Sequence, residues 1–259
     1  MTYCLGIKTR AGLVFASDSR TNAGMDQVNV CRKLHTFVKP GERVLVLLTS
    51  GSLSVCQSIL TLVRNEFQSG HGLASVDSLY DAARCVGEHV RKVAELDREA
   101  LERDKIAFNP NLLLGGQVRG EPPDLYLIYP QGNPLRATED SPYLQIGETK
   151  YGRPILDRGL KFHETTLEEA AKYAVISLDS TMRSNVTVGP PVDLLLYPVG
   201  SLEIKRQVRL QADDPQLRTI HQLWEQSLRH AVQALPAISF GEEANGQPQS
   251  AAPTAIAPR

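Results

Sequence analysis

Strand-like segments come in consecutive runs along this 259-residue chain and do not alternate one by one with helices. In four other segments, apolar residues recur at steps of three and four, which predicts amphipathic helices. Runs of strands separated by helices favour antiparallel sheets with helices packed on their faces over a parallel βαβ arrangement. The predicted strands are 2–8, 13–16, 33–38, 43–48, 111–118, 124–129, 192–197 and 202–210, and the predicted helices are 53–67, 79–103, 167–182 and 215–235.

Two antiparallel sheets stacked face to face, each covered by a helix layer, use every one of these elements. We therefore predict an α+β fold, a four-layer αββα sandwich, over residues 1–235 as one domain. From Pro236 onward the composition shifts to Ala, Pro, Gln, Gly and Ser. That composition is typical of a disordered tail, which we predict for residues 236–259.

Bulk composition excludes several classes of function. The 28 Lys and Arg residues nearly balance the 29 Asp and Glu residues, which argues against a dedicated nucleic-acid binder. No apolar run approaches the ~20 residues that cross a bilayer, and the N-terminus lacks the pattern of a secretory signal. These features predict a cytoplasmic protein with no nucleic-acid partner and no membrane partner.

The four cysteines are Cys4, Cys31, Cys56 and Cys85. They form no CxxC pair, and the scattered histidines show no cluster beside them, which disfavours a zinc site. Gly115-Gly116 is not followed by a phosphate-loop lysine, which argues against nucleotide binding. The sequence therefore predicts reduced thiols, no metal and no cofactor.

The second residue is a candidate nucleophile. Thr2 directly follows Met1, and a residue this small permits removal of the initiator methionine. An N-terminal threonine carries both a nucleophilic hydroxyl and its own base, an α-amine with a reference pKa of about 7.7–8.0. No separate histidine is needed for such chemistry.

Asp18 and Lys33 are the predicted partners of Thr2. A nearby lysine ammonium keeps the α-amine neutral and stabilises a developing alkoxide, and an aspartate beside it holds the lysine in place. Asp18 ends the second predicted strand, which pairs back along the first and brings Asp18 close to Thr2. These residue types are common, however, and their spacing alone does not identify a site.

A family resemblance adds weight to this interpretation. Thr2, the turn at 10–12, the run ending in Asp18, and Lys33 opening a strand resemble a proteasome-type β subunit and the bacterial peptidase HslV. The family places Asp sixteen residues after its nucleophilic Thr, as Thr2 and Asp18 are placed here. It places Lys thirty-two residues after, whereas Lys33 lies thirty-one after Thr2.

The same resemblance implies three further site residues. A glycine amide donates to the oxyanion in the family, and Gly51 matches that position. The family's Asp-x-x-Ser-Gly element corresponds to Asp179 and Ser184, with wider spacing and Asn185 in place of the glycine. Asn133 also replaces a family serine. These departures are most similar to the Anbu group of bacterial proteasome homologues.

The resemblance implies the N-terminal-nucleophile hydrolase fold and a threonine-type peptidase that cleaves peptide or amide bonds through an acyl-enzyme. It also implies a homo-oligomer of many identical subunits, in a ring or an open helical ring. Two alternatives stay open: a non-proteolytic scaffold with the proteasome fold, and an amide hydrolase acting on small non-protein amides. The need for an ATPase partner is likewise left open.

Overall fold

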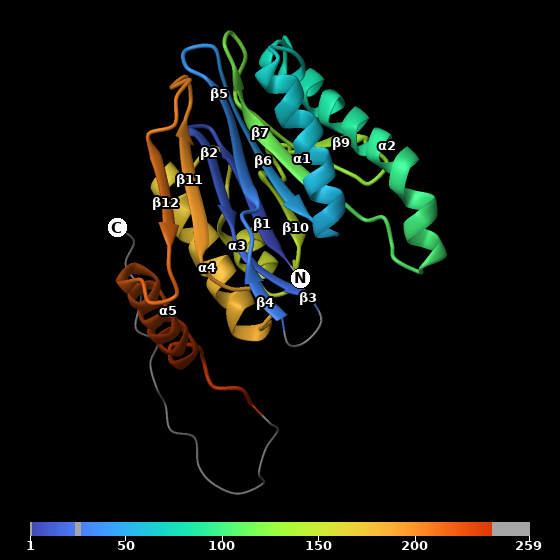
Figure 1. The fold of residues 1–259 in the computed structure, drawn as a ribbon. Coiled ribbons are helices and arrows are strands. Elements are labelled where there is room, and N and C mark those ends of the chain that lie inside the picture. The colour runs from blue at the N-terminus through green and yellow to red at the C-terminus, as the bar shows by residue number, and fades with distance from the viewer. Residues whose placement is uncertain (1, 24–26, 240–259) are drawn as a thin grey trace, which may run out of the picture. The chain divides into compact units, whose positions relative to one another are not determined.

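The computed structural model describes residues 2–23 and 27–239 (Figure 1). One five-stranded antiparallel sheet has the order β10-β1-β2-β11-β12. Its strands are β1 (Tyr3–Thr9), β2 (Gly12–Ser17), β10 (Tyr143–Gly147), β11 (Val192–Pro198) and β12 (Arg206–Leu210).

The second five-stranded sheet is also antiparallel and has the order β5-β6-β7-β8-β9. Its strands are β5 (Leu34–Lys39), β6 (Arg43–Ser50), β7 (Asn111–Val118), β8 (Asp124–Ile128) and β9 (Pro134–Arg136). A separate two-stranded hairpin, β3 (Arg20–Ala23) and β4 (Gln27–Val30), lies between β2 and β5 in sequence.

The two large sheets stack face to face, and helices cover their outer faces (Figure 1). Helices α1 (Leu53–Gln68) and α2 (Leu79–Arg103) cover the second sheet, while α3 (Arg153–Gly159) and α4 (Leu167–Ser184) cover the first. This arrangement confirms the predicted four-layer αββα sandwich.

Both faces of strand β6 are buried, which explains why its sequence is apolar nearly throughout. Its residues point alternately to opposite faces of the sheet. Val44 and Val46 pack in the core between the sheets, whereas Leu45 and Leu47 pack under α1 and α2. Because both faces are covered, an uninterrupted apolar run is what such a central strand requires.

Helix caps explain where two of the covering helices begin. The Ser78 side chain accepts a hydrogen bond from Asp81 N at the start of α2. At the start of α4, Thr166 and Glu169 form a capping box in which each side chain bonds to the other's backbone N–H. Such caps satisfy backbone donors that a helix leaves free in its first turn.

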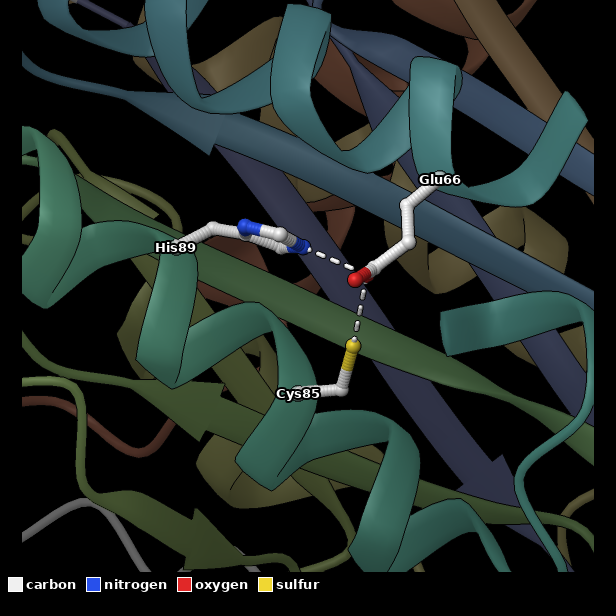
Figure 2. Close-up of side chains that lie close together, drawn as sticks. All are labelled: Glu66, Cys85 and His89. Atoms are coloured by element: carbon white, nitrogen blue, oxygen red, sulfur yellow. Dashed lines mark hydrogen bonds and ion pairs between the residues drawn. The ribbon is translucent and has the colours of Figure 1, made fainter. Parts of the chain in front are cut away.

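A polar cluster joins α1 to α2. Glu66 of α1 lies against Cys85 and His89, which come from successive turns of α2 (Figure 2). The expectation that no histidine lies beside a cysteine is therefore wrong at this place. Cys85 and His89 are four residues apart on α2, and residues at this spacing share one face of a helix.

Several short elements differ from the predicted ones. The hairpin β3-β4, strands β9 and β10, and helix α3 have no predicted counterpart. The final strand begins at Arg206, not at Leu202, because residues 201–205 form a loop in which Leu202 adopts a positive φ of 45°. The loop therefore leaves the first four residues of the predicted strand, 202–205, outside the sheet.

The chain divides into two compact units, Met1–Gln222 and Leu223–Arg259, and the division falls inside α5 (Pro215–Gln233). The predicted boundary at residue 235 therefore lies within the second unit. Residues 240–259 of the predicted tail lie outside the described residues. Within the described part of the chain, no helix is both long and apolar enough to cross a membrane.

Candidate active site

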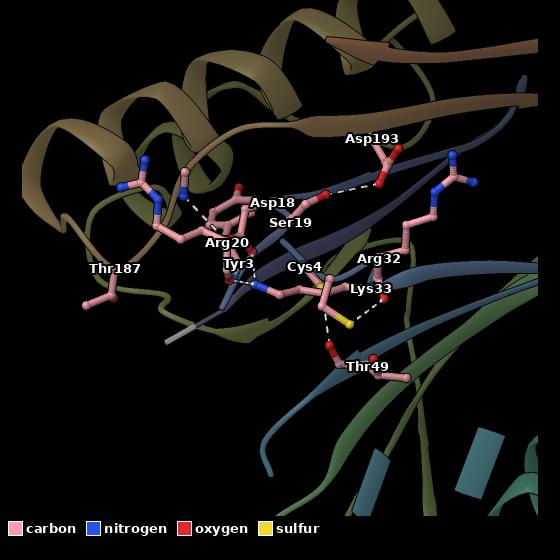
Figure 3. Close-up of polar contacts among 12 residues, drawn as sticks. Tyr3, Cys4, Asp18, Ser19, Arg20, Arg32, Lys33, Thr49, Thr187 and Asp193 are labelled. Atoms are coloured by element: carbon pink, nitrogen blue, oxygen red, sulfur yellow. Dashed lines mark hydrogen bonds and ion pairs between the residues drawn. The ribbon is translucent and has the colours of Figure 1, made fainter. Parts of the chain in front are cut away.

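Asp18 lies at the end of β2, fully buried beside the first residues of β1 (Figure 3). Its Oδ1 accepts hydrogen bonds from Tyr3 N at 2.8 Å and from Lys33 Nζ at 2.6 Å. Its Oδ2 accepts from Gly189 N at 3.3 Å. The antiparallel pairing of β1 with β2, predicted from the intervening turn, brings this carboxylate to the N-terminus.

Lys33 directly precedes β5 and is only 6% exposed. Its ammonium donates to Asp18 and, at 2.6 Å, to the carbonyl oxygen of Arg20. Burial raises the pKa of Asp18 above its ordinary value, and the charge and hydrogen bond of Lys33 act against that rise. A buried charge is tolerated where, as here, it is both paired and hydrogen-bonded.

Thr2 lines two cavities, and Thr21, Ser50 and Gly51 also line both of them. The first cavity, of about 470 Å³, is also lined by Lys33. The second cavity, of about 630 Å³, extends past Gly147 and Asn109. Thr2 therefore adjoins enough open space to accept part of a bound molecule in either cavity.

Gly51 forms the junction between β6 and α1. Its φ is +116°, and a Cβ at this position would lie 2.4 Å from the carbonyl oxygen of Asn109. Its N–H donates to no atom of the described residues. Gly51 therefore supplies an available backbone donor at both cavities, the kind of group that stabilises an oxyanion.

The model of the proteasome subunit family matches residues 2–195.

The chain belongs to the proteasome family.

Solved Anbu structures share its fold over nearly the whole length. Anbu (ancestral beta-subunit) from Yersinia bercovieri is 45% identical with a TM-score of 0.87, covering 93% of this chain and 100% of that chain. An Anbu Gly-1 mutant from Hyphomicrobium sp. strain MC1 is 40% identical with a TM-score of 0.87, covering 93% and 100%. The helical assembly of the Anbu complex from Pseudomonas aeruginosa gives 45% identity and a TM-score of 0.87, covering 92% and 98%. A search of curated proteins finds no match.

Two of the residues expected from the proteasome pattern lie away from these cavities. Asp179 is on α4, where its carboxylate lies 3.0 Å from Nδ1 of His221. Ser184 is exposed at the last turn of α4. Neither is among the described residues that line the cavities around Thr2.

Glu148 and Asn185 lie in the Thr2 region of this proteasome-type chain instead, and the sequence predicted neither of them as a neighbour of Thr2. Glu148 N donates to the carbonyl oxygen of Thr2 at 2.7 Å, and Asn185 Nδ2 donates to Glu148 Oε2 at 3.0 Å. Gly147 packs so closely on Thr2 that a Cβ there would lie 2.0 Å from the Thr2 carbonyl oxygen. These residues come from segments without apolar periodicity, so no pattern in the sequence marks them.

The first cavity has a cationic wall. His35 Nδ1 lies 2.9 Å from Arg64 Nη2, and because a guanidinium only donates, the imidazole accepts here and is neutral. Burial lowers the pKa of His35 to about 4, and the charges of Arg64 and Arg32 act in the same direction. No carboxylate of the described residues lines this cavity.

Proposed function

We propose that this chain is a threonine-type peptidase or amide hydrolase whose nucleophile is the hydroxyl of Thr2, exposed by removal of Met1. The observation that carries the proposal is that Thr2 lines two cavities together with Gly51, whose N–H is available, and that the buried Lys33–Asp18 pair adjoins the first cavity. Each of these groups has a distinct part in acyl transfer.

The reaction begins when Thr2 Oγ attacks a substrate carbonyl carbon and its proton passes to the Thr2 α-amine, directly or through water. The Gly51 N–H donates to the oxyanion of the tetrahedral intermediate. As the C–N bond breaks, the proton passes to the leaving nitrogen, and an ester on Thr2 is left. Water then attacks this ester, which restores the hydroxyl and releases the acid.

Lys33 acts through its charge. An ammonium beside the N-terminus disfavours protonation of the α-amine and stabilises negative charge on Thr2 Oγ. The hydrogen bonds to Asp18 and to the Arg20 carbonyl hold the Lys33 ammonium in one place. Asp18 is thus a positioning residue, because its carboxylate contacts Lys33 and the Tyr3 N–H.

The substrate class follows from the first cavity. Arg32 and Arg64 line it together with the neutral His35. A cationic wall without a facing carboxylate among the described residues favours a substrate group that carries negative charge. We expect peptides with an acidic side chain next to the cleaved bond to react faster than those with a basic one.

Self-association belongs to the same proposal. The related structure from Pseudomonas aeruginosa is described as a helical assembly of the Anbu complex. We propose that this chain also assembles from identical copies, as a ring or an open helical ring. Light scattering and electron microscopy test this directly, and a protein that stays monomeric at all concentrations would contradict it.

The test of the nucleophile compares the wild-type protein with Thr2→Ala and Thr2→Ser. All three residues are small enough to permit removal of Met1. Intact mass spectrometry after exposure to an acylating β-lactone or an epoxyketone should show one adduct in wild type and in Thr2→Ser, and none in Thr2→Ala. Circular dichroism checks that the variants keep the fold.

Substrate libraries of peptides and small amides separate the remaining alternatives. Turnover of peptides supports the peptidase, whereas an adduct with turnover of small amides alone identifies an amide hydrolase. Absence of any adduct in the wild-type protein would refute the proposed nucleophile and favour a scaffold.

A further inference from the structure

The polar cluster between α1 and α2 has the composition of a transition-metal site. It consists of Glu66, Cys85 and His89, and none of the three lines the cavities around Thr2. One potential ligand atom from each residue lies within 4.8 Å of the other two. His89 Nε2 is 2.8 Å from Glu66 Oε2, and Cys85 Sγ is 3.5 Å from the same oxygen.

Helix geometry sets this arrangement. Cys85 and His89 are four residues apart on α2, so both side chains project from the same face in successive turns (Figure 2). Glu66 reaches toward them from the last turn of α1. Two ligands on one rigid helix and a third on its neighbour form a preorganised set.

The ligand types point to a particular class of metal. A thiolate and an imidazole suit Zn²⁺ and related transition metals, whereas Mg²⁺ and Ca²⁺ prefer oxygen ligands throughout. Zinc sites of one sulfur, one nitrogen and one oxygen ligand fall within the range that the metal accepts. A fourth, tetrahedral position is then left for solvent.

The present spacing is close to what zinc needs. Bonds of about 2.0–2.3 Å at tetrahedral angles place ligand atoms roughly 3.3–3.8 Å apart. The Glu66–His89 distance of 2.8 Å must widen slightly, and the Cys85–Glu66 distance of 3.5 Å already fits. Because the Glu66 side chain is 39% exposed, its carboxylate can turn without moving either helix, and solvent can reach the fourth position.

We propose that Glu66, Cys85 and His89 bind one zinc ion, with a water molecule as the fourth ligand. On binding, the Cys85 thiol releases its proton to solvent, and the resulting thiolate coordinates the metal. The zinc ion then cross-links α1 to α2. Since α1 also lines the first cavity through Gln57 and Arg64, the metal fixes that wall as well.

The experiment uses the full-length protein after treatment with a chelator, titrated with Zn²⁺ against a competing indicator and, separately, with Co²⁺. We expect one Zn²⁺ per chain and a raised melting temperature. Bound Co²⁺ should show a thiolate-to-metal charge-transfer band and the intense visible absorption of tetrahedral cobalt. Cys85→Ser and His89→Gln should each weaken Zn²⁺ binding by at least about tenfold and, for Cys85→Ser, abolish the charge-transfer band.

Matched controls are available in the same chain. Cys31→Ser and His163→Gln remove a thiol and an imidazole elsewhere and should leave Zn²⁺ affinity unchanged. Circular dichroism of the metal-free variants checks that α1 and α2 are intact. No binding by the wild-type protein, or equal binding by Cys85→Ser and by Cys31→Ser, would overturn the proposal. The Thr2→Ala variant should bind Zn²⁺ as the wild-type protein does. The zinc titration therefore tests the metal site independently of the proposed nucleophile.

Discussion

Mild acid should destabilise this fold through His35, whose ring accepts a hydrogen bond from Arg64. Protonating the imidazole removes that acceptor and places a third positive charge beside Arg64 and Arg32. Burial, the largest cause, and these two cations lower the pKa of His35 from 6.5 to about 4 in the folded state. Replacement by asparagine, His35→Asn, keeps a side-chain acceptor but removes the titration.

The sign and size of the effect follow from linkage. Because the folded pKa is the lower one, the unfolded state binds more protons between pH 6.5 and about 4, and stability falls as the pH falls through this range. The unfolded and folded pKa values of His35 differ by about 2.5. At about 1.4 kcal/mol for each pKa unit, the folded protein loses about 3 kcal/mol of stability once His35 is fully protonated. At about pH 5, with solvent screening of a partly exposed ring, we expect about 1–2 kcal/mol.

The assay measures the free energy of unfolding in urea for the wild-type protein and His35→Asn, at about pH 7 and about pH 5. Circular dichroism follows the unfolding, so the readout does not depend on enzymatic activity. Other carboxylates and histidines titrate in both proteins, so the difference between the two pH dependences isolates His35. We expect wild type to lose about 1–2 kcal/mol more than His35→Asn on acidification. Equal losses in the two proteins would show that His35 titrates normally in the folded state and would refute the reasoning.

Two further substitutions test the buried pair and the glycine at the cavities. Asp18→Asn leaves the Lys33 ammonium buried without its carboxylate, and we expect denaturant unfolding to show a loss of about 3–5 kcal/mol. Glu168→Gln, which breaks the exposed ion pair with Arg206, should leave stability nearly unchanged. A similar loss in Asp18→Asn and Glu168→Gln would show that burial of the Lys33–Asp18 pair does not set the cost. Gly51→Ala should lower the free energy of unfolding by about 1–3 kcal/mol because of the positive φ, and by a further amount because the new Cβ clashes with Asn109. The variant should also react more slowly with the acylating probe. Gly120 also has a positive φ, but a Cβ there would meet open space, so Gly120→Ala is the control. If Gly51→Ala and Gly120→Ala lose equal stability, the clash with Asn109 contributes nothing.

The parts of the fold with strong local patterns were predictable. The pairing of β1 with β2, and with it the place of Asp18 beside the start of β1, follows from two β-rich runs around one turn. The position of Lys33 before β5 is predictable in the same way. Local periodicity and turn residues carry this information, and a long apolar strand such as β6 marks the centre of a sheet.

The parts of the site that depend on packing were not predictable. Glu148 and Asn185 meet near Thr2 although thirty-seven positions separate them, and neither lies in a periodic segment. Asp179 lies toward His221 because α4 continues through Ser184, so the spacing borrowed from the family pattern does not bring it to the cavities. The Cys85–His89 pair is visible in the sequence as a four-residue spacing, which differs from the spacing of a CxxC pair.

The two cavities that Thr2 lines bear on how the proposed ester intermediate is consumed. After the first half of the reaction, the acylated half of the substrate stays in one cavity while the other is vacated by the leaving amine. Whatever enters the vacated space next competes for the ester. A concentrated peptide amine should therefore intercept the acyl group ahead of water, and the products would include a newly joined peptide. Partitioning between hydrolysis and aminolysis would then report how well the vacated cavity binds an amine.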